Sequence, residues 1–123
     1  MAISLRSQGS EFSAFTPAVG LKVSVVVPIK DEYESLTHLI DAIAGTLQAA
    51  DLTYEIIGVD DGSTDGTTDL LKQLARTRQD IKAVILRRNY GQTAAMAAGF
   101  RHARGETIVT MDGDLQNDPA DIP

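Results

Sequence analysis

Two aspartates one residue apart, Asp112 and Asp114, follow an apolar stretch in the segment VTMDGDLQND, residues 109–118. Side chains at positions i and i+2 of an extended segment face the same way, so these carboxylates repel each other unless a cation or proton lies between them. Oxygen ligands suit a hard divalent ion, Mg²⁺ or Mn²⁺, which usually completes its shell with substrate phosphates. The segment therefore predicts a metal site, and a polar loop in which Asp114 caps a turn is the alternative.

A second acidic pair, Asp60 and Asp61, closes the apolar segment YEIIGVD and precedes GSTDG. Turn chemistry explains Gly62 and Ser63, but it does not explain two adjacent carboxylates at the end of a buried strand. A carboxylate at that place could accept hydrogen bonds from a nucleotide base or a ribose hydroxyl. An EF-hand is excluded for both acidic loops, because the central glycine and the terminal glutamate are out of register.

Basic side chains follow the third apolar segment, where Arg87 and Arg88 lie side by side in the sequence. A guanidinium group can bind a diphosphate through paired, charge-assisted hydrogen bonds. One of the two arginines is expected to do so and the other to be exposed to solvent. Arg101, His102 and Arg104 fall on the following helix, and we expect all three to be exposed and assign them no role.

The elements that must position these groups alternate from residue 22 onward. Apolar, β-branched runs predict strands at residues 22–28, 54–60, 81–87 and 107–112. The first intervening helix has one apolar stripe, formed by Leu36, Leu39, Ile40, Ile43 and Leu47. The second is expected to be capped by Ser63 or Asp65 and to bury Leu70, Leu71 and Leu74.

The third helix, QTAAMAAGFRHA, is rich in small residues, which predicts close packing against the sheet, and Gly105 is expected to close it. Strands that alternate with helices predict the α/β class: an open, mostly parallel sheet with alternating helices. Right-handed crossovers bring the carboxyl ends of all the strands to one edge, where ligands bind in such folds. The polar clusters PIKDE, DDGSTDG, RRNYG and DGDLQ all fall at that edge.

The bulk composition of the 123 residues, 43% hydrophobic and 23% charged, suits one globular domain. The net charge of −6 argues against nucleic-acid binding. The absence of cysteine fits a reducing compartment, so we expect a cytoplasmic location. Residues 1–20 show no periodicity and are interpreted as a flexible leader or a cloning-derived segment, which leaves residues 21–123 as the domain.

Several nucleotide-binding and hydrolase motifs are absent from the sequence. No Gly-x-Gly-x-x-Gly follows the first strand, and no P-loop signature is present. No Gly-x-Ser-x-Gly elbow of a hydrolase occurs either. A dinucleotide dehydrogenase, a P-loop NTPase and an α/β-hydrolase are therefore disfavoured.

Four segments in order resemble the nucleotide-binding half of a family 2 glycosyltransferase of the GT-A fold: VSVVVPIKDEYESL, YEIIGVDDGSTDGT, LRRNYGQTAAMAAGF and GETIVTMDGDLQNDP. Together they cover nearly all of the chain from Lys22 onward. Within that family, RNYGQ and DGDLQNDP resemble the polyprenyl-phosphate glycosyltransferases, a group that includes dolichol-phosphate mannose synthases and undecaprenyl-phosphate aminoarabinose transferases. The resemblance implies a Rossmann-like half of a GT-A fold.

The resemblance also implies roles for individual residues. Asp61 matches the carboxylate that recognises the base, and Asp60 supports its loop. Asp31 stands where the family more usually has Asn, and Gln92 where many relatives carry Lys. The positions that match nucleotide or donor contacts are Pro28, Lys30, Glu32, Arg88 and Gln92. The positions that match the metal-binding triplet, in which Mg²⁺ or Mn²⁺ bridges both phosphates, are Asp112, Asp114 and Gln116, the two aspartates being the expected catalytic pair.

The implied reaction transfers a sugar, with inversion, from a UDP- or GDP-linked donor to a polyprenyl phosphate. A GT-A domain of this family needs about another 100 residues, so we expect this chain to be a truncated fragment that binds nucleotide weakly and does not turn over. The acceptor half and any membrane-associated segments would then follow Pro123, placing the longer protein at the cytoplasmic face of a membrane. Two alternatives stay open at this point: a sugar-phosphate nucleotidyltransferase and a non-catalytic nucleotide-binding or interaction module.

Overall fold

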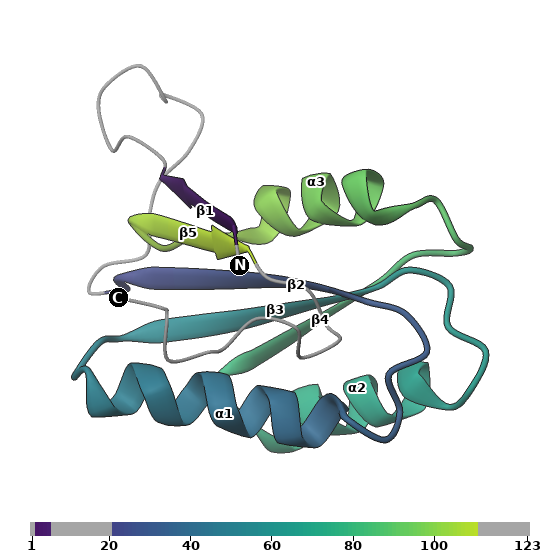
Figure 1. The fold of residues 1–123 in the computed structure, drawn as a ribbon, viewed down its shortest axis with the longest axis horizontal. Helices are drawn as coiled ribbons and strands as arrows, with labels where there is room; N and C mark the ends of the chain where they lie inside the picture. Colours follow the sequence, from purple (N-terminus) through teal and green to yellow (C-terminus); the bar gives the residue numbers. More distant parts are fainter. Residues whose placement is uncertain (1, 6–20, 111–123) are drawn as a thin grey trace.

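The computed structural model describes residues 2–5 and 21–110, in which strands and helices alternate along the chain (Figure 1). No helix in these two ranges is long and apolar enough to cross a membrane. The elements are β1 Ala2–Leu5, β2 Val23–Ile29, α1 Leu36–Ala49, β3 Tyr54–Asp60, α2 Thr67–Thr77, β4 Ile81–Ile85, α3 Gln92–His102 and β5 Thr107–Thr110.

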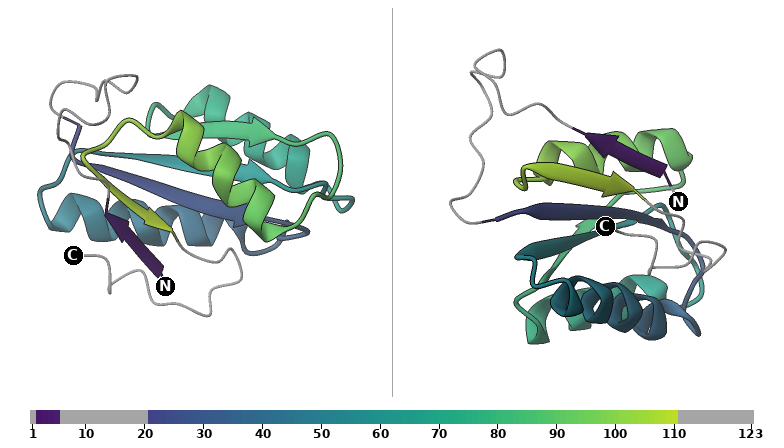
Figure 2. Two further views of the ribbon diagram at one scale, coloured as in Figure 1. Left: turned by 90° about the horizontal axis from the view of Figure 1, so that it is seen from above. Right: turned by 60° about the vertical axis from the view of Figure 1, so that its left-hand side comes forward.

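The strands form one five-stranded sheet in the order β1-β5-β2-β3-β4. β2, β3, β4 and β5 run parallel, and β1 runs antiparallel to β5 at the edge. From β2 the chain proceeds outward to β3 and β4, and then returns through α3 to place β5 on the other side of β2. Because right-handed crossovers in opposite directions put their helices on opposite faces, α1 and α2 cover one face and α3 the other (Figures 1 and 2). The predicted α/β class, an open and mostly parallel sheet, is confirmed.

The edge strand β1 was not expected from the sequence. Its four residues pair with β5 from Ala2 opposite Thr110 to Leu5 opposite Thr107. A segment of this length is too short to display a strand period, so the pattern of residues 1–20 does not predict it. In the fold, β1 supplies hydrogen-bond partners to the outer edge of β5, which would otherwise be an open edge of the sheet.

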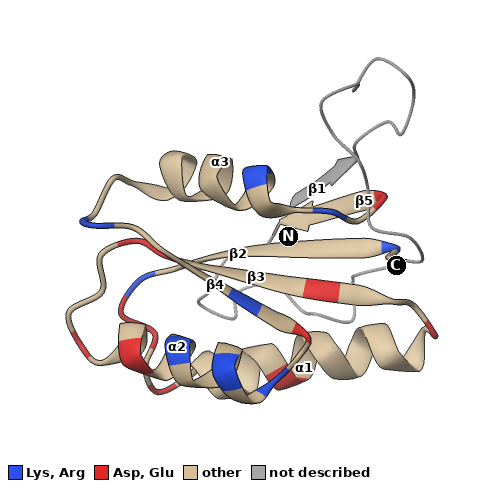
Figure 3. Cartoon of the chain, turned by 180° about the vertical axis from the view of Figure 1, so that it is seen from behind, with Lys and Arg blue, Asp and Glu red and all other residues tan. Residues whose placement is uncertain are grey.

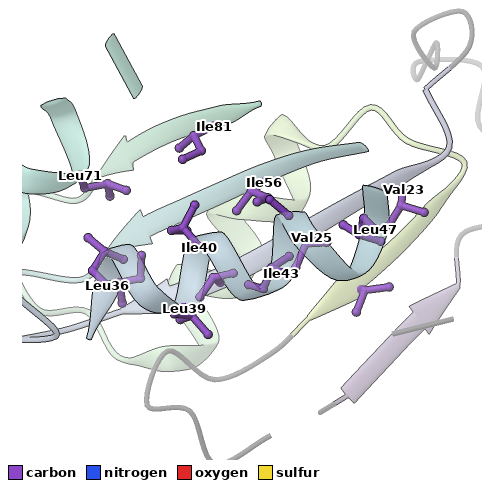
Figure 4. Packing of buried hydrophobic residues seen from close by; sticks show 14 residues of the cluster. Val23, Val25, Leu36, Leu39, Ile40, Ile43, Leu47, Ile56, Leu71 and Ile81 are labelled. Carbon is purple, nitrogen blue, oxygen red and sulfur yellow. The ribbon is translucent and has the colours of Figure 1, made fainter. Parts of the chain in front are cut away.

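One hydrophobic core lies between the sheet and the helices α1 and α2 (Figure 4). All five residues of the predicted stripe on α1 are fully buried there, against Val25 of β2 and Ile56 of β3. On α2, Leu71 is buried as predicted, but Leu70 and Leu74 are only half-buried. The reason is position, since α2 packs largely against β4, which forms the edge of the sheet.

The second core, on the opposite face, depends on small residues in α3. Ala95, Ala98 and Gly99 are buried against the sheet. A Cβ added to Gly99 would lie 2.3 Å from Cγ1 of Val26 and 3.2 Å from Cγ2 of Val59. The helix backbone therefore lies directly on the two central strands, which confirms that the small residues serve close helix–sheet packing.

The end of α3 differs from the prediction. The helix ends at His102 with Ala103 as its cap, and Gly105 has no positive φ, so Gly105 is not the left-handed closing residue. Instead, a Cβ on Gly105 would lie 2.7 Å from the backbone nitrogen of Ser24. Gly105 is thus required for close approach of the chain to β2 and not for its conformational freedom.

A buried polar cluster lies beside Gly105, close to the amino-terminal ends of the strands. The carboxylate of Glu55 accepts hydrogen bonds from the Ser24 hydroxyl (2.6 Å) and the Arg104 amide (2.7 Å). It also forms a 2.7 Å ion pair with Lys82. Burial by itself raises the pKa of Glu55, but these three hydrogen bonds outweigh it and leave the pKa below its ordinary value. The cluster therefore attaches the segment after α3 to the sheet, and this attachment depends on the negative charge of Glu55.

Two glycines in helices allow one substitution to be compared in two environments. Gly99→Ala should lower the free energy of unfolding by about 1–3 kcal/mol, because the new methyl group overlaps Val26. Gly45→Ala, in α1, should raise it by about 0.5–1 kcal/mol, since nothing lies within 4 Å of that Cβ and alanine favours the helix. Urea unfolding of both variants is the measurement. Equal or greater stability of Gly99→Ala would contradict the close packing of α3.

The Glu55 cluster should make the stability of the protein depend on pH. A folded-state pKa below the unfolded value of about 4.5 contributes stability that is present above that value and is lost as pH falls through the folded pKa. Glu55→Gln should therefore cost about 1.5–3 kcal/mol at pH 7, and the difference from the parent should shrink below pH 4.5. Glu106→Gln, which removes the exposed ion pair with Lys22, is the control and should cost under about 1 kcal/mol. A pH-independent difference for Glu55→Gln would refute the assignment.

Candidate active site

Three neighbouring strands end at the same level of the sheet. Ile29 pairs with Asp60, which in turn pairs with Ile85, so β2, β3 and β4 all stop on one rung. The segments that follow are the first loop (residues 30–35), the second loop (residues 61–66) and the third loop (residues 86–91), which lie together at the right of Figure 1. β2 is also the strand at which the direction of the strand order reverses. The carboxyl ends of strands beside such a reversal are where open α/β sheets bind their ligands.

The first loop is tied to the second loop and the start of α2 by its own backbone. Three consecutive amides donate to side chains there: Asp31 N to Ser63 Oγ (2.9 Å), Glu32 N to Thr67 Oγ1 (2.9 Å) and Tyr33 N to Asp65 Oδ2 (3.2 Å). Because these amides are engaged within the protein, they are not free donors for an anion. A ligand at the first loop would be met by side chains, and that of Lys30 is exposed.

The carboxylate of Asp60 is buried and serves the second loop. It accepts hydrogen bonds from the Ser63 amide (3.1 Å) and from the hydroxyl of Thr68. The backbone carbonyl of Asp60 accepts the Leu86 amide at 3.0 Å, which continues the pairing with β4. Asp60 thus closes the second loop on itself and joins it to the beginning of the third.

Asp61 connects the second loop to the third. Its two carboxylate oxygens accept the amides of Tyr90 (2.7 Å) and Gly91 (3.0 Å), and the residue is only 5% exposed. Gly91 is the N-cap of α3, so the negative charge lies at the amino-terminal, positive end of the helix dipole. Both the charge and the two oxygens of Asp61 are therefore engaged in holding the third loop.

Gly62 allows the second and third loops to touch. Its φ is +78°, in the left-handed region, and a Cβ would lie 2.4 Å from the backbone nitrogen of Asn89. Only glycine combines that conformation with such an approach. The pattern Asp-Asp-Gly at the end of β3 therefore has a steric reason in addition to its turn chemistry.

The start of α2 corrects the predicted cap. The N-cap is Gly66, with φ of +99°, and neither Ser63 nor Asp65 occupies that position. Asp65 nevertheless accepts the free amide of Thr67 at 3.0 Å, as well as the Thr67 hydroxyl. The bonds from Thr67, together with the one from Tyr33, hold the pKa of Asp65 below its ordinary value.

The remaining predicted contacts are distributed around the same loops. Glu32 is half-buried and accepts the Ser35 hydroxyl at 2.9 Å, next to the start of α1. Arg88 is exposed, and its guanidinium carbon lies 5.1 Å from the ring centroid of Tyr90, in a cation–π contact.

Gln92 is exposed as the first residue of α3, whereas Pro28 is buried inside β2. Arg101, His102 and Arg104 are exposed, as predicted.

The predicted metal ligands Asp112, Asp114 and Gln116 lie outside the described residues. Within residues 2–5 and 21–110, no three His, Cys, Asp or Glu side chains are arranged to hold a metal ion. Figure 3 shows acidic residues in the loops before α1 and α2, and basic residues, which the sequence identifies as arginines, in the loop before α3. Asp31, Asp60, Asp61 and Asp65 of these loops accept hydrogen bonds from amides. The role of the predicted triplet as ligands of Mg²⁺ or Mn²⁺ stays a prediction from the sequence.

The network that holds the loops together has no clear signal in the sequence. Its donors are mostly backbone amides, such as those of Tyr90 and Gly91, which carry no signature of their own. The threonines Thr67 and Thr68, which complete it, look like ordinary helix-start residues. The one usable signal was the density of Asp, Ser and Thr in the second loop, since these side chains commonly bond to nearby backbone.

Asp61 provides a test of this network through its two engaged oxygens. Asp61→Asn should destabilise the protein by about 1–3 kcal/mol, because the new NH2 group faces a backbone N–H and the negative charge at the start of α3 is lost. Amide hydrogen exchange at Tyr90 and Gly91 should accelerate in the same variant, whereas exchange at Leu71 in the core should follow global stability only. Unchanged stability and unchanged exchange would show that Asp61 does not hold the third loop.

Comparison with known proteins agrees with this geometry. The sequence profile of Glycosyl transferase family 2 matches residues 24–123. A dodecaprenyl-phosphate galacturonate synthase from Rhizobium johnstonii is 48% identical over 108 residues, which cover 87% of this chain and 32% of that protein. An undecaprenyl-phosphate 4-deoxy-4-formamido-L-arabinose transferase from Yersinia pestis is 48% identical over 103 residues, covering 83% of this chain and 32% of the relative. The chain thus spans about a third of the length of the curated relatives it matches.

Solved structures show the same fold. A mannosyltransferase from Pyrobaculum calidifontis in complex with GDP-Man and Mn²⁺ superimposes with a TM-score of 0.67 at 27% identity, covering 93% of this chain and 31% of that one. TarS from S. aureus in complex with UDP superimposes with a TM-score of 0.61 at 26% identity, covering 76% of this chain and 28% of that one. The strand–helix order of the present chain and its loops at the carboxyl edge agree with the match over residues 24–123. The chain belongs to glycosyl transferase family 2.

Proposed function

We propose that this chain supplies the nucleotide-sugar site of an inverting glycosyltransferase that transfers a sugar from a nucleotide diphosphate to a polyprenyl phosphate. The observation that carries the proposal is the set of three cross-braced loops at the carboxyl edge, beside the reversal in strand order. The polyprenyl-phosphate acceptor is supported by the names of the curated relatives, and a nucleotide diphosphate by the UDP and GDP-Man complexes of the structural relatives.

The acidic character of the chain raises an electrostatic problem for two anionic substrates. The net charge is −6, and both a diphosphate and a lipid phosphate are repelled by exposed carboxylates. The bonding pattern reduces this repulsion, because Asp31, Asp60 and Asp61 accept backbone amides that partly neutralise their charge. Lys30 and Arg88, both exposed at the same edge, then supply positive charge to the donor.

We assign the base-proximal role to Asp61, on its resemblance to the family carboxylate. Each carboxylate oxygen has two lone pairs, and one amide bond to each leaves a second lone pair on each oxygen. The small exposed fraction of Asp61 restricts such a bond to a group that reaches into the junction of the second and third loops. Its role in the site is therefore twofold: it holds the third loop and offers an acceptor.

Asp112, Asp114 and Gln116 are proposed to hold Mg²⁺ or Mn²⁺, which when bound supplies Lewis-acid charge neutralisation to the leaving diphosphate. Arg88 is proposed to complement it as a counter-charge for the leaving group, its guanidinium restricted by Tyr90. The acceptor phosphate is already anionic, so the chain need not provide a strong general base. We also propose that the whole protein associates with a membrane, because its proposed acceptor is a lipid.

Calorimetric titration with UDP and GDP, with and without Mn²⁺, tests the proposal directly. We expect one nucleotide to bind, with an affinity that rises at least about tenfold when Mn²⁺ is added. Asp112→Ala and Asp114→Ala should remove the Mn²⁺ dependence. Asp118→Ala, an acidic residue of the same segment outside the predicted triplet, should retain it. Nucleotide binding that ignores Mn²⁺ in the parent would favour a non-catalytic binding module, and no binding at all would reject the proposed site.

A further inference from the structure

Asp31 has an unusual backbone conformation for a residue with a side chain. Its φ is +52°, and among the described residues the only other non-glycine with a positive φ is Asp51, at +57°. Aspartate and asparagine tolerate this region better than other side chains because they can bond locally to the backbone. Asp51 follows the end of α1, where a left-handed residue is common, but Asp31 lies at the carboxyl end of β2, between Lys30 and Glu32.

The conformation of Asp31 is accompanied by a reciprocal pair of hydrogen bonds across two loops. The Asp31 amide donates to Ser63 Oγ at 2.9 Å, and the Thr64 amide donates to Asp31 Oδ1 at 2.7 Å. The amides of Glu32 and Tyr33 also donate outward from the first loop, whereas the Thr64 hydroxyl donates to Asp31 Oδ1 at 3.5 Å. Both bonds from Thr64 run toward the first loop and depend on the Asp31 carboxylate.

We propose that Asp31 is a positioning residue for nucleotide binding: its carboxylate holds the first and second loops in register, so that Lys30 and Asp61 face one donor. This inference rests on the proposed function and adds to it a residue that acts through loop geometry without touching the nucleotide. The register pairs Ile29 with Asp60, so Lys30 and Asp61 are the first residues after two adjacent strands. The bond between Asp31 and Thr64 joins the two loops beyond that rung, and we infer that it sets how they diverge.

Three substitutions separate the carboxylate from the backbone conformation. Asp31→Asn keeps the Oδ1 acceptor and tolerates the left-handed region, so we expect nucleotide affinity within about twofold of the parent. Asp31→Gly keeps the conformation without strain but has no acceptor, and Asp31→Ala keeps neither. Both should weaken nucleotide binding by about fivefold to tenfold. Rescue by Asn but not by Gly is the pattern that assigns the effect to the hydrogen bond.

Asp51→Ala is the matched control. It removes an exposed aspartate from the same backbone region at φ of +57°, at the turn between α1 and β3. We expect it to lower stability in the same way as Asp31→Ala but to leave nucleotide affinity unchanged. An equal loss of affinity in Asp51→Ala would show that global stability, and not loop register, governs binding, and it would overturn the proposal.

Amide hydrogen exchange gives a readout that does not require nucleotide. The Thr64 amide should exchange at least about tenfold faster in Asp31→Gly than in Asp31→Asn, with core amides unaffected. If the parent binds no nucleotide, the proposed function fails and so does the positioning role, while this exchange result still decides whether the bond orders the loop. If the parent binds nucleotide and Asp31→Gly binds equally well, the positioning role alone is refuted.

Discussion

The structure depends on one recurrent interaction, in which aspartates at or just after the ends of parallel strands accept backbone amides of the loops at that edge. Asp31 accepts Thr64, Asp60 accepts Ser63, and Asp61 accepts the amides of the third loop. Loops without regular structure have many unpaired amides, and burying them unpaired is costly. Here the carboxylates satisfy these amides and link three loops into one surface, whose charges are thereby partly neutralised before any ligand arrives.

The remainder of the fold keeps that surface in place. The packing of Gly99 against Val26 sets α3 close to the sheet, and Asp61 receives the amide at its beginning. At the other end of the same helix, Glu55 receives the Arg104 amide. Helix α3 is therefore held at both ends by carboxylates on β3 or directly after it, which ties the third loop to the central strands. Acidic residues therefore stabilise the structure at both the amino-terminal and the carboxyl-terminal ends of the strands.

The architecture could be predicted from the sequence because strand and helix periods are properties of side-chain patterns, such as the stripe from Leu36 to Leu47. The carboxyl-edge location of Lys30, Asp61 and Arg88 followed from topology alone. The bonds of Asp61 could not be predicted, because their donors are amides whose positions depend on the third loop. Gly105 was misjudged for a related reason: a close approach to Ser24, 81 residues earlier in the chain, leaves no local pattern. The roles of Asp112, Asp114 and Gln116 stay predictions from the sequence.

We propose that the three loops at the carboxyl edge form the nucleotide site. The most direct test is amide chemical-shift mapping of the labelled chain during titration with UDP or GDP and Mg²⁺. Each amide in the three loops gives its own signal, so binding at each loop is observed separately. We expect shifts concentrated in residues 30–35, 61–66 and 86–91, with Glu55, Lys82 and Arg104 at the opposite edge unchanged. Shifts centred on the Glu55 cluster, or spread evenly over both edges, would contradict it.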